Sequence, residues 1–516
     1  MPQEEGEDAL IGSLLKPVVV MALLGIIVTA CASDAPLYRQ ESGNSTRISP
    51  CALDASLQDA SPERQDFDYT IRIRPWDLSD AELAEALDLA QSAGVTTVDF
   101  EASWPRLDQD ESSGSKQTYD WHHADRLVRA SEARGMRVTF LLTQTPDWVH
   151  PYLQETVANK DDRTWYAAKG STELQHWSNF VRDVVERYRG RVTHYEIWNE
   201  PNLVDFWKPR PDVNEYIPLL REAYLSAKKT DPDAKIVFGG LSKNDLGYLN
   251  EYYRVINVSY PEAASHDYFF DVLGVHPYSN DRSPDRYTPD AIYQGEYGAV
   301  NENFLGFACM KEVMENQGDS EKNLFLSEYG FTTVDTSWMK AVPDSRRALY
   351  LKRAYELARD IPYLEGLSWY AYYPGFDAPQ YTLVDENFNP SLTFRAYKQV
   401  TGAEVSNVAV TINVPDSVSG THAIDPQLNN LSNSDISRWE LWVDGALVGE
   451  QPAAPINWDV QDAEAGVHEV MVAAYTTEGS VWHSNIVKTN VVYNYADCFT
   501  LLCLLQRLLG IPLPGS

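Results

Sequence analysis

The sequence predicts an α/β protein in which an eight-stranded (β/α)8 barrel precedes a smaller C-terminal β-sandwich. Two observations lead to this fold class. Up to about residue 402, short apolar runs alternate with helical patterns, which indicates a parallel sheet. Beyond that point, short runs of alternating apolar and polar residues are separated by turn residues. An open, doubly wound sheet has the same alternation as a barrel, but eight strand and helix units favour closure.

The barrel is expected over residues 68–402, and its strands can be placed in order. The eight candidate strands lie at residues 69–74, 96–102, 137–143, 192–198, 235–240, 271–276, 323–329 and 366–372. The helix expected over residues 77–94 carries clear boundary signals. Ser79 and Glu82 have the spacing of a capping box, and Gly94 is a typical helix end.

Residues 403–495 are expected to form an immunoglobulin-like β-sandwich. Its role stays open between a spacer, a domain packed against the barrel and a carbohydrate-binding module that uses its tryptophans; packing is favoured. Residues 496–516 form an apolar tail that is short for a membrane span, so a docked helix is expected there. Within that tail, Cys498 and Cys503 could pair or could be two apolar residues of a helix.

The N-terminal region has the features of an export signal. An apolar stretch at residues 17–30 is too short for a confident membrane span and is followed at once by Cys31. The segment from Val28 to Cys31 resembles the bacterial lipobox, in which the cysteine is lipidated. We therefore expect a lipoprotein signal peptide over residues 1–31, a polar tether over residues 32–67, and a secreted, membrane-anchored protein at the cell surface or in the periplasm. An uncleaved anchor is the alternative.

The remaining cysteines, which include Cys51 and Cys309, are too few and too scattered for a disulfide scaffold, and no zinc-binding spacing occurs.

Two glutamates are the strongest candidates for catalysis. Glu200, in YEIWNEPN, ends the fourth apolar run, and Glu328, in FLSEYGF, ends the seventh. In a barrel these strand ends meet at one mouth, where catalytic residues lie. Two carboxyl groups there suggest glycoside hydrolysis, and a retaining enzyme holds them roughly 5 to 5.5 Å apart. Glu196 shares a strand face with Glu200 and is expected to have a structural or supporting role.

The motifs also carry a family resemblance. NEPN after the fourth strand, SEYG after the seventh and WYAYY after the eighth together resemble clan A of the retaining glycoside hydrolases. Neighbouring segments such as FEASWPRLD are most similar to family 39 and its family 5 relatives, and the resemblance spans residues 68–402. It implies a TIM barrel that needs no cofactor and no metal, with Glu200 as the acid/base and Glu328 as the nucleophile.

The resemblance implies further site residues. Asn199 is expected to bind the sugar 2-hydroxyl, if the strand distorts there. His276 and Tyr278 match positions that orient the nucleophile, and Trp369 matches the aromatic platform under the sugar. Other residues at strand ends are weaker candidates: Trp104, Trp148 and Trp207 for further subsites, and Arg74 for either a hydrogen bond near the nucleophile or an ion pair at the barrel mouth.

The net charge of the chain limits the classes of substrate that are expected. With 42 basic and 75 acidic residues, the formal net charge is −33, so a nucleic-acid partner is not expected. An anionic polysaccharide is disfavoured for the same reason, which leaves a neutral or cationic glycan. We expect endo-acting cleavage of a β-linked polysaccharide in a cleft walled by the long segments 144–171 and 279–301. The alternative is a non-catalytic lipoprotein that binds carbohydrate or assists exopolysaccharide assembly on a barrel scaffold.

Overall fold

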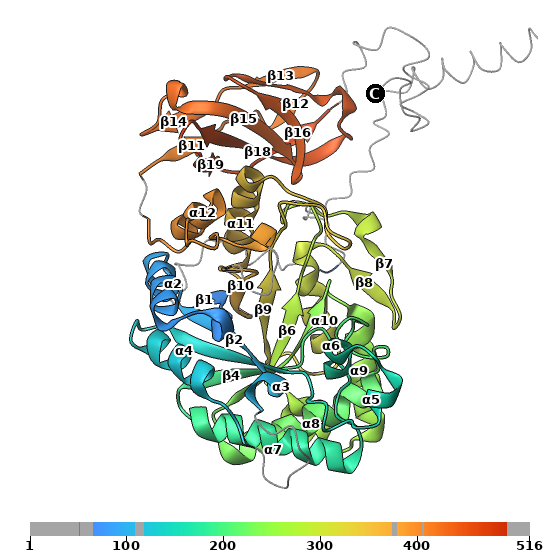
Figure 1. Ribbon diagram of the computed structural model, residues 1–516. Coiled ribbons are helices and arrows are strands. Elements are labelled where there is room, and N and C mark those ends of the chain that lie inside the picture. Colours follow the sequence, from blue (N-terminus) through green and yellow to red (C-terminus); the bar gives the residue numbers. More distant parts are fainter. Residues whose placement is uncertain (1–50, 52–65, 109–117, 374–378, 405–406, 493–516) are drawn as a thin grey trace, which may run out of the picture. The chain divides into compact units, whose positions relative to one another are not determined.

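The computed structural model describes residue 51 and residues 66–108, 118–373, 379–404 and 407–492 (Figure 1). The expected signal peptide, Cys31, most of the tether, and the tail with Cys498 and Cys503 lie outside the described residues. Within the described ranges, no helix is long and apolar enough to cross a membrane.

The predicted barrel is confirmed. Eight parallel strands close into a ring in the order β1-β10-β9-β6-β5-β4-β3-β2, so each strand lies beside its neighbours along the chain and β1 pairs with β10. The strands are β1 (Asp68–Arg72), β2 (Thr97–Ser103), β3 (Arg137–Thr143), β4 (Val192–Ile197), β5 (Lys235–Ser242), β6 (Val272–His276), β9 (Asn323–Tyr329) and β10 (Leu364–Trp369).

Helices surround these strands and pack their apolar faces on them (Figure 1). They are α2 (Asp80–Ser92), α3 (Trp104–Leu107), α4 (His122–Glu132), α5 (Leu153–Thr156), α6 (Lys160–Thr164), α7 (Gly170–Tyr188), α8 (Val213–Thr230), α9 (Leu246–Ser259), α10 (Phe307–Asn316), α11 (Asp344–Ala358) and α12 (Leu392–Val400). The capping box predicted at Ser79 and Glu82 is present. Short 3-10 helices are η2 (Pro75–Asp77), η3 (Ala263–Phe269), η4 (Pro289–Ala291), η5 (Phe304–Gly306) and η6 (Pro379–Tyr381).

A disulfide joins Cys51 to Cys309, which lies in α10. The two residues are 258 positions apart, so spacing in the sequence could not reveal the pair. The bond ties the segment before the barrel to the outer helical layer. Nearby, the hairpin of β7 (Ile292–Gln294) and β8 (Ala299–Asn301) extends the connection between β6 and α10.

The C-terminal region is β-rich and built of mainly antiparallel sheets, as predicted. Its largest sheet has the order β12-β20-β18-β15-β16, with β19 paired to β18, and two further pairs are β11 with β14 and β13 with β17. The strands are β11 (Ala409–Thr411), β12 (Ser417–Val418), β13 (Thr421–Ile424), β14 (Gln427–Asn429), β15 (Ile436–Val443), β16 (Ala446–Gln451), β17 (Ile456–Asp459), β18 (Gly466–Thr476), β19 (Val481–His483) and β20 (Val487–Val491), with η7 (Asn433–Asp435) and η8 (Val460–Asp462) between them.

One side of this β-rich region packs against α11 of the barrel. Trp442, Met471 and Tyr475 belong to the same buried apolar cluster as the barrel core. Glu440, which is fully buried, accepts hydrogen bonds from the Tyr475 hydroxyl (2.7 Å) and from Arg346 of α11 (3.2 Å). A buried carboxylate needs such partners, because an unpaired buried charge is strongly destabilising. The contact is therefore a specific interface.

Candidate active site

The chain leaves extended geometry directly after β4. Trp198 (φ 71°) and Glu200 (φ 40°) both adopt left-handed backbone conformations, which non-glycine residues rarely occupy. Buried anchors hold this distortion: the Trp198 indole donates to the Phe206 carbonyl (2.7 Å), and the Tyr216 hydroxyl donates to the Ile197 carbonyl (3.0 Å). Strain that the surrounding structure supports is typical of functional sites. The strand distortion that the role of Asn199 requires is thus present.

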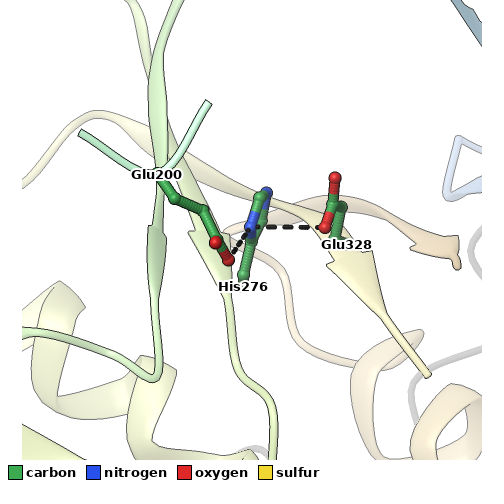
Figure 2. A group of neighbouring side chains, drawn as sticks. All are labelled: Glu200, His276 and Glu328. Atoms are coloured by element: carbon green, nitrogen blue, oxygen red, sulfur yellow. Dashed lines mark hydrogen bonds and ion pairs between the residues drawn. The ribbon is translucent and has the colours of Figure 1, made fainter. Parts of the chain in front are cut away.

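Glu200 and Glu328 lie on either side of His276 (Figure 2). The His276 Nδ1 atom is 2.9 Å from Glu200 Oε1 and 3.6 Å from Glu328 Oε2. One oxygen of each carboxyl group and a ring nitrogen of His276 all lie within 4.8 Å of one another. Inverting glycosidases need a wider gap of roughly 6.5 to 9.5 Å to admit a water molecule. The separation seen here is that of a retaining pair.

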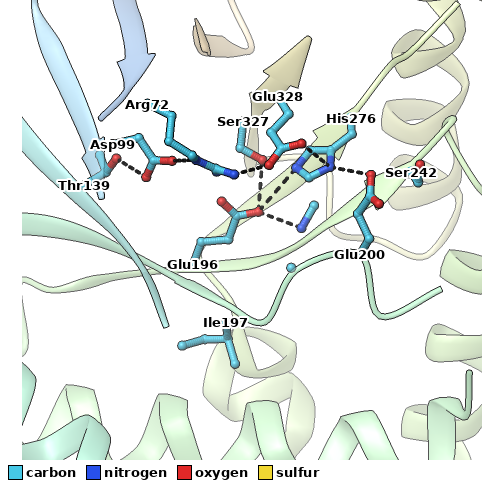
Figure 3. Close-up of polar contacts among 12 residues, drawn as sticks. Arg72, Asp99, Thr139, Glu196, Ile197, Glu200, Ser242, His276, Ser327 and Glu328 are labelled. Carbon is cyan, nitrogen blue, oxygen red and sulfur yellow. Dashed lines mark hydrogen bonds and ion pairs between the residues drawn. The ribbon is translucent and has the colours of Figure 1, made fainter. Parts of the chain in front are cut away.

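Glu328 is held in its ionised form. It is the last residue but one of β9, and it contacts the Arg72 guanidinium (Figure 3). It also accepts a hydrogen bond from the Tyr278 hydroxyl (3.1 Å). Burial alone would raise the pKa of Glu328, but the positive charges of Arg72 and His276 and the Tyr278 hydrogen bond outweigh it. The pKa therefore lies below the ordinary value, as a carboxylate nucleophile requires.

Arg72 was not identified from the sequence. Its Nε atom binds Asp99, which also accepts a hydrogen bond from Thr139 (3.0 Å), so the guanidinium is fixed beside Glu328. Arg74, the residue considered for this place, instead forms an ion pair with Glu101 (2.9 Å). The first strand was predicted to end at residue 74, but it ends at Arg72 because Pro75 begins a 3-10 helix. The ion pair considered as the alternative for Arg74 is therefore present.

His276 is fully buried between the two glutamates. Burial alone would lower the pKa of its imidazole, but the negative charges of Glu328, Glu200 and Glu196 raise it to about 8. The ring fits because residue 240 of β5 is glycine: a Cβ atom there would lie 2.1 Å from His276 Nε2. At neutral pH the imidazole is thus a cation that stabilises the negative charge of Glu328.

Glu196 is a third buried carboxyl group in the barrel. It accepts hydrogen bonds from the Gly240 backbone N–H (2.7 Å) and the Ser327 hydroxyl (3.0 Å), and its Oε1 atom is 3.9 Å from His276 Nε2 (Figure 3). Burial raises its pKa to about 7, although His276 and Arg72 act in the opposite direction. Its predicted supporting role fits these contacts. The sequence could not show that it titrates near neutral pH.

The cluster has more acids than bases. Four carboxyl groups, from Asp99, Glu196, Glu200 and Glu328, face two basic side chains, Arg72 and His276 (Figure 3). A buried carboxylate without a basic partner is costly. A carboxyl group in such a cluster therefore retains a proton at a pH where isolated carboxyl groups have lost theirs. General acid catalysis needs a proton of this kind.

The positions of Glu200, Glu328 and His276 would allow them to bind a cation. However, Arg72 already neutralises Glu328 and would repel a cation there.

Asn199 and Trp369, two of the predicted substrate contacts, each have a polar side-chain atom that could bind a ligand. Asn199 is 7% exposed, and its Oδ1 atom has no hydrogen-bond partner among the residues that the structure describes. Trp369, at the end of β10, packs edge-on against Tyr329, and its Nε1 atom has no partner in the same part of the chain. A sugar hydroxyl could satisfy either atom. The roles of Asn199 and Trp369 stay predictions.

Trp104 and Trp207 are fully buried, as Trp369 is, and they pack among other aromatic side chains, which does not favour the predicted subsite role. Trp104 stacks on Phe180 of α7 at 5.2 Å, and Trp207 packs edge-on against Trp198 at 5.4 Å. They fill the layer between strands and helices. Trp148 is only half-buried, and its indole donates to Asp108 (2.6 Å). An aromatic residue after a strand has the same sequence signal whether it faces a ligand or the helical layer, so the pattern could not separate these cases.

Residues 108–352 match the family model "Glycosyl hydrolases family 39". This part of the barrel is similar to the family 39 glycoside hydrolases. The chain shares 29% identity over 133 residues with a β-xylosidase from Geobacillus stearothermophilus, a match that covers 23% of this chain and 24% of that protein. It shares 25% identity over 130 residues with endo-1,4-β-xylanase A from Xylanibacter ruminicola, covering 24% of this chain and 32% of that protein.

These alignments therefore span only a quarter to a third of the curated relatives. A solved structure of a family 39 glycoside hydrolase from the gut symbiont Bacteroides cellulosilyticus WH2 superposes with a TM-score of 0.51 at 18% identity. That superposition covers 83% of this chain and 79% of the other, and it shows a shared fold.

Proposed function

We propose that this protein is a retaining β-glycosidase that cleaves its substrate by double displacement, with Glu328 as nucleophile and Glu200 as acid/base. The observation that carries the proposal is the close approach of the two carboxyl groups around His276, within the span of 4.8 Å described above. The low pKa of Glu328 and the match to family 39 support the same assignment.

The chemistry proceeds in two steps. In the first, a Glu328 oxygen attacks the anomeric carbon while Glu200 gives its proton to the departing glycosidic oxygen, so a glycosyl ester forms and an alcohol leaves. In the second, Glu200 removes a proton from water, the hydroxide attacks the anomeric carbon, and the Glu328 carboxylate is released. Esterification removes the charge of Glu328, which makes a negative charge on Glu200 easier to accept in the second step.

The substrate we propose is a neutral β-linked oligosaccharide or polysaccharide, cleaved internally. The net charge of −33 disfavours polyanions. The two curated relatives are named as acting on xylosides and xylan, so xylose-containing glycans come first in a substrate panel. Internal cleavage is proposed because an enzyme tethered to a surface meets polymers.

We also propose that the protein acts outside the cytoplasm, held by a lipid on Cys31. The lipobox-like segment before that residue and the Cys51–Cys309 disulfide support this location, because disulfides persist mainly in oxidising compartments. Cell fractionation with a Cys31→Ala variant tests it: the variant is expected to move from the membrane fraction to the soluble fraction. An unchanged membrane fraction contradicts the lipid anchor.

The function itself is tested with the protein spanning residues 32–516. Release of reducing ends is measured on aryl β-glycosides and β-linked glycans for wild type, Glu200→Gln and Glu328→Gln, with Glu85→Gln on the exposed face of α2 as the matched control. We expect both active-site variants to lose at least ~100-fold in kcat while the control keeps full activity. Proton NMR of the first product must show the β-anomer; an α-anomer would contradict the retaining mechanism, and binding without cleavage would favour the scaffold alternative.

A further inference from the structure

The chain that follows β6 carries a residue that binds the nucleophile. Residues 277–286, called the β6 loop below, begin with Pro277 and Tyr278, whose hydroxyl donates to Glu328. The loop is folded back on itself, because the Arg282 N–H donates to the Ser279 carbonyl (3.1 Å) and the next turn repeats this pattern. Ser279 also hydrogen-bonds the Tyr329 hydroxyl (3.0 Å). A shift of this loop would therefore move a group that stabilises the ionised nucleophile.

The far end of the β6 loop is held by a buried ion pair. Asp285 accepts two hydrogen bonds from Arg353 of α11, at 3.1 and 2.7 Å, and both side chains are less than 10% exposed. Bidentate pairs of this kind fix orientation as well as position. Arg353 also binds Glu356, and Glu356 binds His483 Nε2 of β19 at 2.8 Å. A continuous series of polar contacts thus runs from the C-terminal region to the β6 loop.

A second contact from the C-terminal region reaches the same place. The turn between β15 and β16 consists of Asp444 and Gly445, both with positive φ (49° and 69°), as a tight two-residue hairpin requires. A Cβ atom on Gly445 would lie 2.5 Å from the backbone nitrogen of Arg286 and 2.8 Å from the carbonyl carbon of Asp285. The hairpin turn thus rests directly on the backbone of the β6 loop, and only glycine leaves room for it.

We infer that the C-terminal β-rich region is a positioning element of the active site: by holding the β6 loop at residues 285 and 286, it keeps Tyr278 against Glu328. This inference rests on the proposed function. The two contacts described above are independent of each other, since one acts through side chains of α11 and the other through backbone packing at Gly445. They converge on adjacent residues of one loop.

The tryptophans of this region favour positioning over carbohydrate binding. Trp439, Trp442 and Trp458 are each less than 5% exposed, so none offers a face on which a sugar could stack. Trp482 is partly buried, and the ammonium group of Lys352 lies 4.4 Å from the centre of its ring. The side of the region formed by Trp442 and Trp482 is occupied by α11.

The test compares two glycine substitutions in the same region. Gly445→Ala adds a methyl group against the β6 loop, whereas Gly420→Ala adds one at a similar φ (62°) with no atom of the described residues within 4 Å. Both variants therefore bear a similar backbone strain, and only the first pushes on the loop. We expect Gly445→Ala to lower kcat/KM at least ~10-fold and Gly420→Ala to change it less than ~2-fold.

The pH profile separates positioning from simple loss of structure. The groups facing Glu328 are Arg72 of β1, His276 and Tyr278, with Arg74, Glu196 of β4 and Glu200 after β4 beyond. Of these, the β6 loop carries only Tyr278. In Gly445→Ala the acid limb of kcat/KM is expected to move to higher pH, because a weaker Tyr278 hydrogen bond stabilises the carboxylate less.

Asp285→Asn serves as a second variant, because it keeps the side-chain shape and weakens the ion pair with Arg353. It is expected to shift the acid limb in the same direction. Hydrogen exchange of the amides of residues 278–286 is measured in parallel, and faster exchange in Gly445→Ala than in Gly420→Ala is expected whether or not a substrate is found. Equal amide exchange and equal pH profiles in the two glycine variants would overturn the inference. If the wild type cleaves no substrate but the amides of the β6 loop still exchange faster in Gly445→Ala than in Gly420→Ala, only the proposed function is overturned.

Discussion

Replacing Glu196 with glutamine is expected to make the protein more stable at neutral pH. The carboxyl group is buried, and its pKa rises from 4.5 to about 7. Its two hydrogen-bond donors, the Gly240 backbone and the Ser327 hydroxyl, can donate equally well to the amide oxygen of glutamine. The substitution therefore removes an ionisable group and leaves the packing around residue 196 in place.

The sign and size follow from the pKa of the folded state. Below pH 4.5 Glu196 is protonated whether the chain is folded or unfolded, so the ionisation costs nothing. As the pH rises the unfolded chain loses this proton first, and the stability of the folded state falls until the pH passes about 7. A difference of about 2.5 pH units corresponds to about 3 kcal/mol, which is the gain expected for Glu196→Gln over this range.

Urea unfolding of wild type and Glu196→Gln is measured from pH 4.5 to 7, a range that stays below the pKa of about 8 of His276. The gap in unfolding free energy should widen with pH in favour of the variant. Glu85→Gln, on an exposed face of α2, serves as the control and should give no such trend. If the curves for wild type and Glu196→Gln run parallel, the carboxyl group does not hold a proton in the folded state and the reasoning fails.

Three further outcomes are expected. Tyr278→Phe removes a hydrogen bond to the ionised nucleophile worth about 1.5 to 3 kcal/mol, so the acid limb of kcat/KM should move up by about 1 to 2 pH units; an unmoved limb would contradict the contact. Gly240→Ala should displace His276 and lower kcat at least ~10-fold with little change in KM, measured by steady-state kinetics. Cys51→Ser with Cys309→Ser should lower the unfolding free energy by about 2 to 4 kcal/mol in urea while kcat stays unchanged at 25 °C; equal stability would show that the disulfide has no role in it.

The sequence was sufficient for the barrel and for the closeness of Glu200 and Glu328, because both depend on local signals that repeat. Apolar runs mark each buried strand, and β3 and β9 have the predicted bounds. A glutamate at the end of such a run lies at the barrel mouth whatever the details of packing. The positions of Glu200 and Glu328 therefore followed from strand ends alone.

The rest depended on contacts between distant residues. Arg72 and Asp99 bind each other across β1 and β2, and neither has a motif that distinguishes it from an ordinary ion pair. The burial of Trp104 and Trp207 is set by helices that pack over them, such as α7. Gly445 occupies an ordinary hairpin turn in the sequence, and only the folded chain brings it against residues 285 and 286.

The Cys51–Cys309 disulfide also has a mechanical consequence. If Cys31 is the proposed anchor, the twenty residues that lead from it to Cys51 can span at most about 70 Å, which is the greatest distance at which the protein could work from its membrane. Any pull along this segment would pass through the disulfide into α10, on the outside of the barrel. The disulfide thus gives such a pull a covalent route that does not run through β1, whose last residue, Arg72, contacts Glu328. With the proposed anchor in place, the disulfide would carry a force from the membrane to the outer helical layer and away from the cluster around Glu328.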